Sequence, residues 1–93
     1  MNSYCIATDE ENVLIIGGND KEIDNRSTTK THLYSISQDT WSRGPNLNRA
    51  RYHAKATYLG GFIYTFFGED QKDQMSIGLS SIERIDTRTF KEW

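Results

Sequence analysis

Residues 13–20 read Val-Leu-Ile-Ile-Gly-Gly-Asn-Asp, and residues 63–70 repeat the pattern 50 positions later as Ile-Tyr-Thr-Phe-Phe-Gly-Glu-Asp. In each copy an apolar run ends in glycine and passes into polar residues, as expected of a strand that stops at a tight turn. Two further anchors recur in the same order: Leu33 to Ile36 aligns with Ile82 to Ile85 at an offset of 49, and Trp41 aligns with Trp93 at an offset of 52. Three anchors at nearly one period indicate two copies of one structural unit.

The rest of the chain also favours strands. No segment shows the sustained 3.6-residue apolar spacing of a helix of ten or more residues. Six short runs rich in β-branched and aromatic residues are predicted as strands instead: Tyr4 to Thr8, Val13 to Ile16, Leu33 to Ser37, Ala54 to Leu59, Phe62 to Phe67 and Ser81 to Asp86. Gly60 and Gly61 separate two of these runs and suit a tight hairpin turn, because glycine accepts a positive φ. The sequence predicts an all-β chain.

The repeated unit resembles the kelch repeat, whose period is about 50 residues and whose copies form the blades of β-propellers. Gly17-Gly18, with Gly68 in the second copy, is similar to the kelch diglycine that ends the second strand of a blade. Trp41 and Trp93 are similar to the blade tryptophan near the fourth strand, and residues 45–54 resemble the segment between blades. Phe67 departs from the pattern by replacing the first glycine of the second pair, so the turn there must accommodate a Cβ atom.

This resemblance implies about two four-stranded antiparallel blades of a propeller. Residues 1–43 would form the first blade, residues 44–52 the inter-blade loop, and residues 53–93 a second blade whose fourth strand is incomplete. The rings of Trp41 and Trp93 would pack on the blade faces. Because a propeller needs about four to eight blades to close, we expect a part of a larger propeller, a truncated gene product, or copies that associate to complete one.

Composition and charge exclude several classes of protein. The formal net charge is only −2, which gives no field for nucleic acid, and no run is long enough to cross a membrane. The single cysteine, Cys5, cannot form an internal disulfide, so a reducing, cytoplasmic location is expected.

Two long polar loops, residues 19–31 and 69–80, are candidates for a partner surface. They begin with Asn19 and Asp20 and with Glu69 and Asp70. In kelch-like propellers such loops emerge on one face and commonly contact partners, so the resemblance implies the same here. The alternative is that both loops are solvated insertions, which loops tolerate at little cost.

A cluster between the two copies contains Arg49, Arg51, Tyr52 and His53. An arginine presents a planar fork that suits carboxylates, so Arg51 could bind an acidic peptide. The alternative is that Arg51 holds the inter-blade turn by donating to backbone carbonyls, with His53 as a structural residue at a strand start.

No catalytic or metal-binding motif is present. Cys5, His32 and His53 lack any short ligand spacing, the glycine pairs are not phosphate loops, and no nucleophile elbow occurs. We therefore predict no cofactor and a non-catalytic kelch-type module that binds a protein or peptide. The competing hypothesis is a piece of a kelch-like propeller enzyme, an oxidase or a sugar epimerase, whose active residues lie in absent blades.

Overall fold

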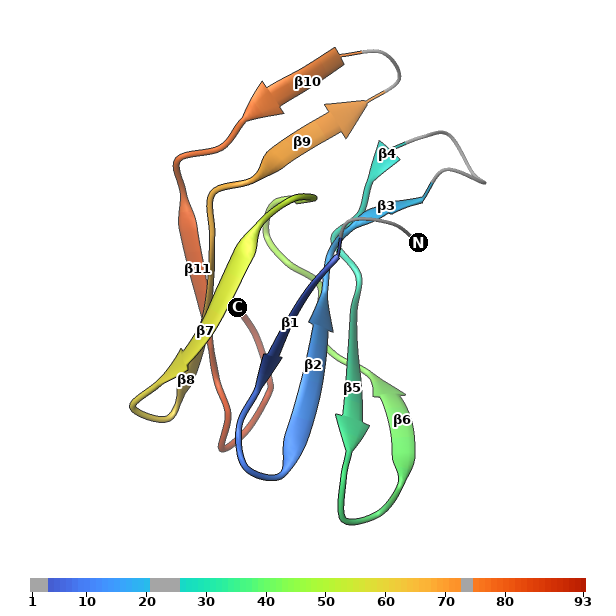
Figure 1. The fold of residues 1–93 in the computed structure, drawn as a ribbon, viewed down its shortest axis with the longest axis vertical. Coiled ribbons are helices and arrows are strands. Elements are labelled where there is room, and N and C mark those ends of the chain that lie inside the picture. Colours follow the sequence, from blue (N-terminus) through green and yellow to red (C-terminus); the bar gives the residue numbers. More distant parts are fainter. Residues whose placement is uncertain (1–3, 21–25, 73–74) are drawn as a thin grey trace.

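A computed structural model describes residues 4–20, 26–72 and 75–93 (Figure 1). These residues form strands and turns and include no helix, which confirms the all-β prediction. The strands are β1 (Cys5–Thr8), β2 (Asn12–Ile16), β3 (Asn19–Asp20), β4 (Arg26–Ser27), β5 (Thr31–Ser35), β6 (Thr40–Arg43), β7 (Lys55–Leu59), β8 (Phe62–Phe66), β9 (Glu69–Lys72), β10 (Met75–Gly78) and β11 (Ile82–Asp86).

The first half of the chain forms sheet 1, a four-stranded antiparallel sheet in the order β1-β2-β5-β6. The strands lie in chain order, with the β3–β4 hairpin inserted between β2 and β5, and a four-stranded sheet is the unit of a propeller blade. Asp9 fixes the first turn, because its Oδ1 accepts hydrogen bonds from the amides of Glu11 at 2.8 Å and Asn12 at 2.6 Å. An aspartate that bonds amides two and three residues ahead is a common turn device.

The second half forms sheet 2, which has three antiparallel strands in the order β7-β8-β11. Gly60 and Gly61 join β7 to β8 with φ values of +60° and +87°, the positive values that a primed turn requires. After β11 the described residues 87–93 form a turn and an irregular segment. Sheet 2 therefore confirms the prediction of an incomplete second blade. The residue boundaries assigned to the two repeats stay a prediction.

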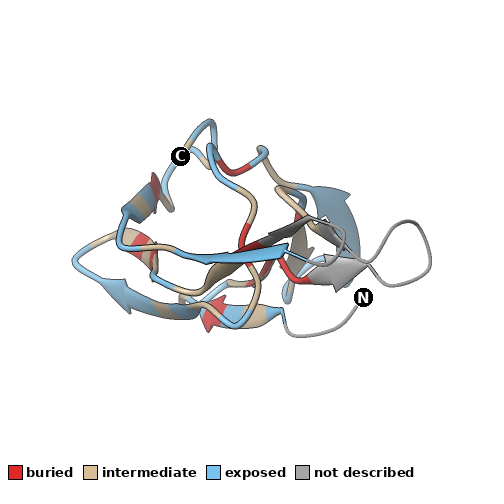
Figure 2. Ribbon diagram, turned by 90° about the horizontal axis from the view of Figure 1, so that it is seen from above, coloured by how far each residue is buried: buried red, intermediate tan, exposed pale blue. Residues whose placement is uncertain are grey.

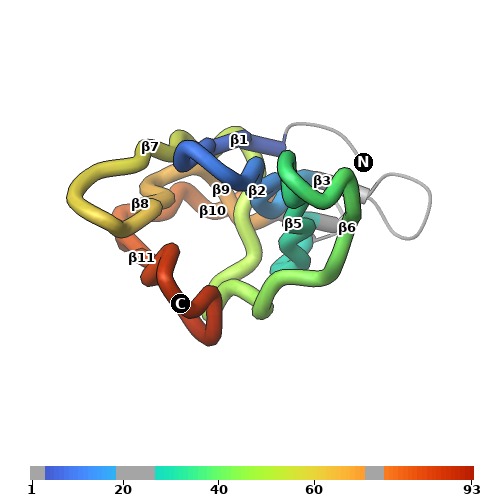
Figure 3. The backbone as a smooth tube through the Cα atoms, turned by 90° about the horizontal axis from the view of Figure 1, so that it is seen from below, coloured from blue at the N-terminus to red at the C-terminus, as the bar shows by residue number. Residues whose placement is uncertain are grey.

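The two sheets pack face to face around a small apolar core. Sheet 1 contributes Ala7, Leu14 and Ile16, sheet 2 contributes Ile63 and Ile85, and Leu47 comes from the segment between them. Figure 2 shows that the buried stretches are short and alternate with half-buried and exposed ones. β1 and β7 lie next to each other, and the connecting segment crosses between the sheets (Figure 3). The chain thus buries one face of each sheet.

Two expectations need correction, one about the burial of a tryptophan and one about the structure of the two loops. Trp93 packs against the core and donates from Nε1 to the carbonyl of Pro45 at 3.0 Å, but Trp41 is 59% exposed on β6. The ring of Trp41 lies on the face of sheet 1 that no other part of the described chain covers. The two predicted loops also contain strands, because β3 pairs with β4 and β9 pairs with β10. Residues 21–25 and 73–74 of those loops lie outside the described residues.

Candidate functional site

The candidate residues gather at one end of the molecule, which we call the hairpin end. It consists of the β3–β4 and β9–β10 hairpins, at the top of Figure 1, and of residues 49–53 that connect the two sheets. β4 packs beside β9. Asn19 and Asp20 lie here in β3, paired along the backbone with Ser27 and Arg26.

Arg51 is the best-buried residue of this end, with a side chain that is 0% exposed. Its Nη1 donates to the carbonyls of Phe67 at 3.0 Å and Ser81 at 2.9 Å, and its Nη2 donates to Ser81 Oγ at 2.7 Å. Its Nε lies 3.2 Å from Oε2 of Glu83, whose side chain is 8% exposed. A buried charge is tolerated because a paired charge and several acceptors replace the lost water.

The backbone of Arg51 contacts the first repeat, at residues just beyond the ends of β2 and β4. Its amide donates to the carbonyl of Thr28 at 3.3 Å, and its carbonyl accepts from the amide of Gly18 at 2.7 Å. Gly17 has φ +64°, and a Cβ atom there would lie 2.5 Å from the Arg51 carbonyl oxygen. The diglycine is therefore required by the close approach of this backbone segment. Arg51 joins the first repeat through its main chain and the second repeat through its side chain.

These contacts separate the two readings of Arg51. Its guanidinium bonds backbone carbonyls and Glu83 inside the protein, as the structural interpretation predicts. With no exposed side-chain surface it cannot meet an acidic peptide, so the binding interpretation of Arg51 is corrected.

Glu83 was not predicted as part of the site. Its Oε1 accepts from the amide of Asn48 at 2.7 Å, and its Oε2 accepts from the amide of Arg49 at 3.1 Å and from Arg51 Nε. In the sequence Glu83 is one polar residue in a β-rich run, which looks like an ordinary exposed strand position. Only the three-dimensional fold brings it to the inter-sheet segment.

Arg49 lies on the surface of the same segment. Its Nε donates to Oδ2 of Asp70 at 3.0 Å, while Oδ1 of Asp70 accepts from Ser27 Oγ at 2.6 Å. Asp70 is nearly buried, but the Arg49 side chain is 48% exposed. The ion pair ties the connecting segment to β9, the Ser27 bond links the two hairpins through Asp70, and part of the Arg49 cation still faces solvent.

Tyr52 and His53 form a second polar group with residues of β9 and β10. The backbones of Tyr52 and Glu69 exchange two hydrogen bonds, at 2.8 and 2.9 Å. Ser76 Oγ donates to Glu69 Oε1 at 2.8 Å, and His53 Nδ1 lies 3.3 Å from Glu69 Oε2. The Ser76 and His53 contacts hold the pKa of the Glu69 carboxyl below its ordinary value. Every group in this set is oriented by a neighbour, and His53 remains largely exposed.

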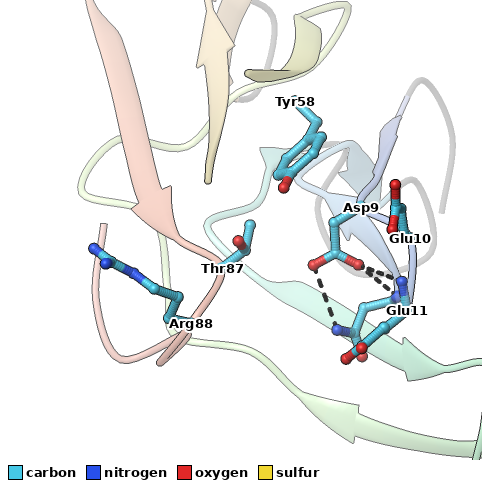
Figure 4. Close-up of a pocket in the computed structure, with 7 residues that line it drawn as sticks. Asp9, Glu10, Glu11, Tyr58, Thr87 and Arg88 are labelled. Carbon is cyan, nitrogen blue, oxygen red and sulfur yellow. Dashed lines mark hydrogen bonds between the residues drawn. The ribbon is translucent and has the colours of Figure 1, made fainter. Parts of the chain in front are cut away.

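A pocket of about 420 Å³ lies at the opposite end, between the β1–β2 turn and sheet 2 (Figure 4). Asp9, Glu10 and Glu11 line one side, and Tyr58, Thr87 and Arg88 line the other. Asp9 is engaged by its own turn, and Arg88 points away from the acidic side and pairs with Asp86 at 2.8 Å. Asp9 and Arg88 therefore already bond within the protein, so neither is a buried polar group that waits for a ligand.

Within residues 4–20, 26–72 and 75–93, no three His, Cys, Asp or Glu side chains gather in a way that could hold a metal ion. The same residues contain no helix that could span a membrane. The hairpin end offers exposed hydrogen-bond donors, charges and rings on a fixed scaffold, which suits recognition of another molecule.

The repeats of this chain are similar to those of known proteins. Residues 2–48, just over half of the chain, match the sequence model of the Kelch motif. The chain is 38% identical over 53 residues to the kelch repeat protein M-T8 of Myxoma virus, a match that covers 57% of this chain and 10% of that protein. It is 27% identical over 89 residues to an F-box/kelch-repeat protein of Arabidopsis thaliana, which covers 96% of this chain and 24% of that protein. The chain therefore spans about a tenth and about a quarter of the lengths of these relatives.

Proposed function

Because this chain belongs to the kelch-repeat family, we propose that it is a non-catalytic protein–protein interaction module that forms part of a larger or assembled propeller. Kelch repeats generally mediate interactions between proteins, and both relatives are kelch-repeat proteins. The observation that carries the proposal is the hairpin end, where a buried Arg51 fixes the segment that presents Arg49, Tyr52 and His53.

The partner we propose is a protein segment rich in acidic residues. Arg49 is the cation that supports this choice, because 48% of its side chain faces solvent while Asp70 holds its Nε. Its guanidinium is thereby oriented before a partner arrives, which lowers the entropy lost on binding. Tyr52 and His53 lie beside each other with ring centroids 4.5 Å apart and add flat surface next to this cation.

Location is proposed on separate grounds. Cys5 is a free thiol, and a chain with one unpaired cysteine suits a reducing compartment such as the cytoplasm.

The partner proposal is tested with a short, fluorescein-labelled peptide rich in Glu and Ser, followed by anisotropy. Arg49→Ala is expected to weaken binding about two- to five-fold, because a half-exposed ion pair contributes about 0.2–1 kcal/mol. The effect should shrink as salt rises, since exposed charges are screened.

The matched control is Arg88→Ala, which removes an arginine at the opposite end of the molecule. It should leave peptide affinity unchanged. Equal loss in both variants, or no loss in Arg49→Ala, would show that general charge and not the hairpin end binds the peptide.

A further inference from the structure

On each sheet, one apolar face is left uncovered by the residues that the structure describes. On sheet 1 the face opposite the core contains Ile6, Val13, Ile15, Tyr34 and Trp41, which we call open face 1. Cross-strand pairing places them together, since Ile6 pairs with Ile15, Val13 with Tyr34, and Tyr34 with Trp41. Residues that pair directly across strands share one face of a sheet. Ile6 is 50% exposed and Trp41 is 59% exposed.

On sheet 2 the corresponding set contains Leu59, Phe62, Tyr64, Phe66 and Ile82, which we call open face 2. Leu59 pairs with Phe62, and Phe66 pairs with Ile82. Leu59 is 68% exposed and Ile82 is 60% exposed. Arg84 covers part of this face, with its guanidinium 4.4 Å from the Phe62 ring centroid.

The repeat shows what open face 2 corresponds to. At the 50-residue offset Tyr64 and Phe66 take the positions of Leu14 and Ile16. Leu14 and Ile16 are fully buried against sheet 2. Open face 2 is therefore the second copy of the surface that sheet 1 packs against a neighbouring sheet, with Lys55 and Thr57 in the places of Cys5 and Ala7.

Open face 1 is the complement. Val13 and Ile15 take the positions of Ile63 and Thr65, which are fully buried against sheet 1. One chain thus displays both halves of its own internal interface, one on each outer side. Identical chains with two different complementary faces can associate head to tail.

We propose that open face 2 of one chain docks on open face 1 of a second copy, repeating the packing of sheet 1 on sheet 2. This deepens the assembled-propeller part of the proposed function by naming the partner and the two faces, and it is independent of what the hairpin end binds. Three copies in a ring would bring about six sheets together, within the range of closed propellers.

The junction between copies lacks the buried ion pair of the internal interface. Glu83 pairs with Thr65, and the residue that pairs with the equivalent Ile15 is His32, so strand pairing aligns the third strands at an offset of 51 and corrects the 49 expected from sequence. Without the buried arginine–glutamate pair this contact relies on apolar area, so association should depend on protein concentration.

The test uses the 93-residue chain and multi-angle light scattering over a range of concentrations. Wild type should have a mass above one chain of 10.7 kDa. Ile82→Lys disables open face 2 and Ile6→Lys disables open face 1, and each alone should be a monomer. Mixed together they retain one complementary pair of live faces, so they should form a particle of two chains that grows no further.

Ile77→Lys is the matched control, because Ile77 is 54% exposed on β10 and belongs to neither face. It should associate like wild type. Leu59→Glu and Trp41→Lys repeat the experiment at a second position on each face, and circular dichroism checks that every variant remains β-rich.

A folded wild-type monomer, an unfolded wild-type chain, or association that survives Ile82→Lys or Ile6→Lys alone would overturn the proposal. Separate blades of a longer polypeptide, not a second copy, would then cover these faces. The Ile82→Lys monomer should still bind the acidic peptide, so failure of one proposal is distinguishable from failure of the other.

Discussion

Arg51 Nε lies 3.2 Å from Glu83 Oε2, and both side chains are almost completely buried between the two sheets. Glu83 also accepts the amides of Asn48 and Arg49, so its carboxylate holds the connecting segment and the arginine together. This buried ion pair therefore holds the exposed residues of that segment in position.

Replacement of Arg51 is expected to be strongly destabilising. Arg51→Met leaves the Glu83 charge buried without its partner, and loss of one member of a buried pair costs about 3–5 kcal/mol. Adding Glu83→Gln should recover part of the loss, because it removes the unpaired charge. Urea unfolding followed by circular dichroism measures both. The control Arg88→Met breaks an exposed ion pair and should leave the midpoint unchanged, and an equal shift in the two arginine variants would contradict the expectation.

A methyl group at Gly17 should disrupt the contact between the sheets. Gly17→Ala places its Cβ 2.5 Å from the Arg51 carbonyl oxygen in addition to forcing a positive φ. Gly60→Ala has a similar φ of +60° but meets nothing within 4 Å. We expect Gly17→Ala to be about 1–3 kcal/mol less stable than Gly60→Ala, the usual cost of overpacking. Thermal and urea unfolding of the two variants check this, and equal stabilities would exclude a role for the close approach.

At position 67 a glycine variant should be more stable than an alanine variant, which is the reverse of the usual order. Phe67 has φ +60°, a left-handed conformation that costs an ordinary residue about 1–2 kcal/mol. Phe67→Gly is therefore expected to be about 1 kcal/mol more stable than Phe67→Ala, although both lose the ring contact with Phe66. At Thr57, on β7, the order should be the ordinary one, with alanine at least as stable as glycine. The same order at both positions would argue against strain at Phe67.

Stability should fall at alkaline pH through Cys5. Burial raises the pKa of the Cys5 thiol, while its hydrogen bond with Thr65 opposes the rise. The unfolded chain therefore releases this proton first, at the ordinary pKa of an exposed thiol. The stabilising contribution is present below that pH and is lost as pH rises toward the folded-state pKa. Cys5→Ala should remove this part of the slope in urea unfolding between neutral and alkaline pH. A slope identical to that of wild type would assign the effect to other groups.

Sequence reasoning predicted what depends on local patterns. The strands around Gly17 and Gly68, the Gly60-Gly61 hairpin and the two-repeat architecture follow from alternation, turn residues and period, which act over a few residues. Arg51 was recognised as important, but its two interpretations differ only in burial. Burial depends on where another repeat packs, which one sequence does not state.

Glu83 and Trp41 show what could not be predicted from the sequence, namely which side chains are buried. Glu83 is a charged residue that becomes buried because Arg51 and two backbone amides supply its hydrogen bonds. Trp41 is a large ring that stays exposed because no described segment covers open face 1. From residue type alone Glu83 would be expected to be exposed and Trp41 to be buried. Both expectations are wrong because contacts between the repeats decide burial here.

The contacts of Arg51 with both repeats also bear on how the two repeats unfold. Arrays of repeats gain cooperativity from the energy of their interfaces, and Arg51 bonds both sides of this one. The Gly18 amide in the first repeat donates to the Arg51 carbonyl, and the Phe67 and Ser81 carbonyls in the second accept from the Arg51 side chain. The Gly18 amide should therefore exchange with solvent in the same opening event that breaks the Phe67 and Ser81 hydrogen bonds. Weakening Arg51 would then divide one cooperative unit into two that open independently.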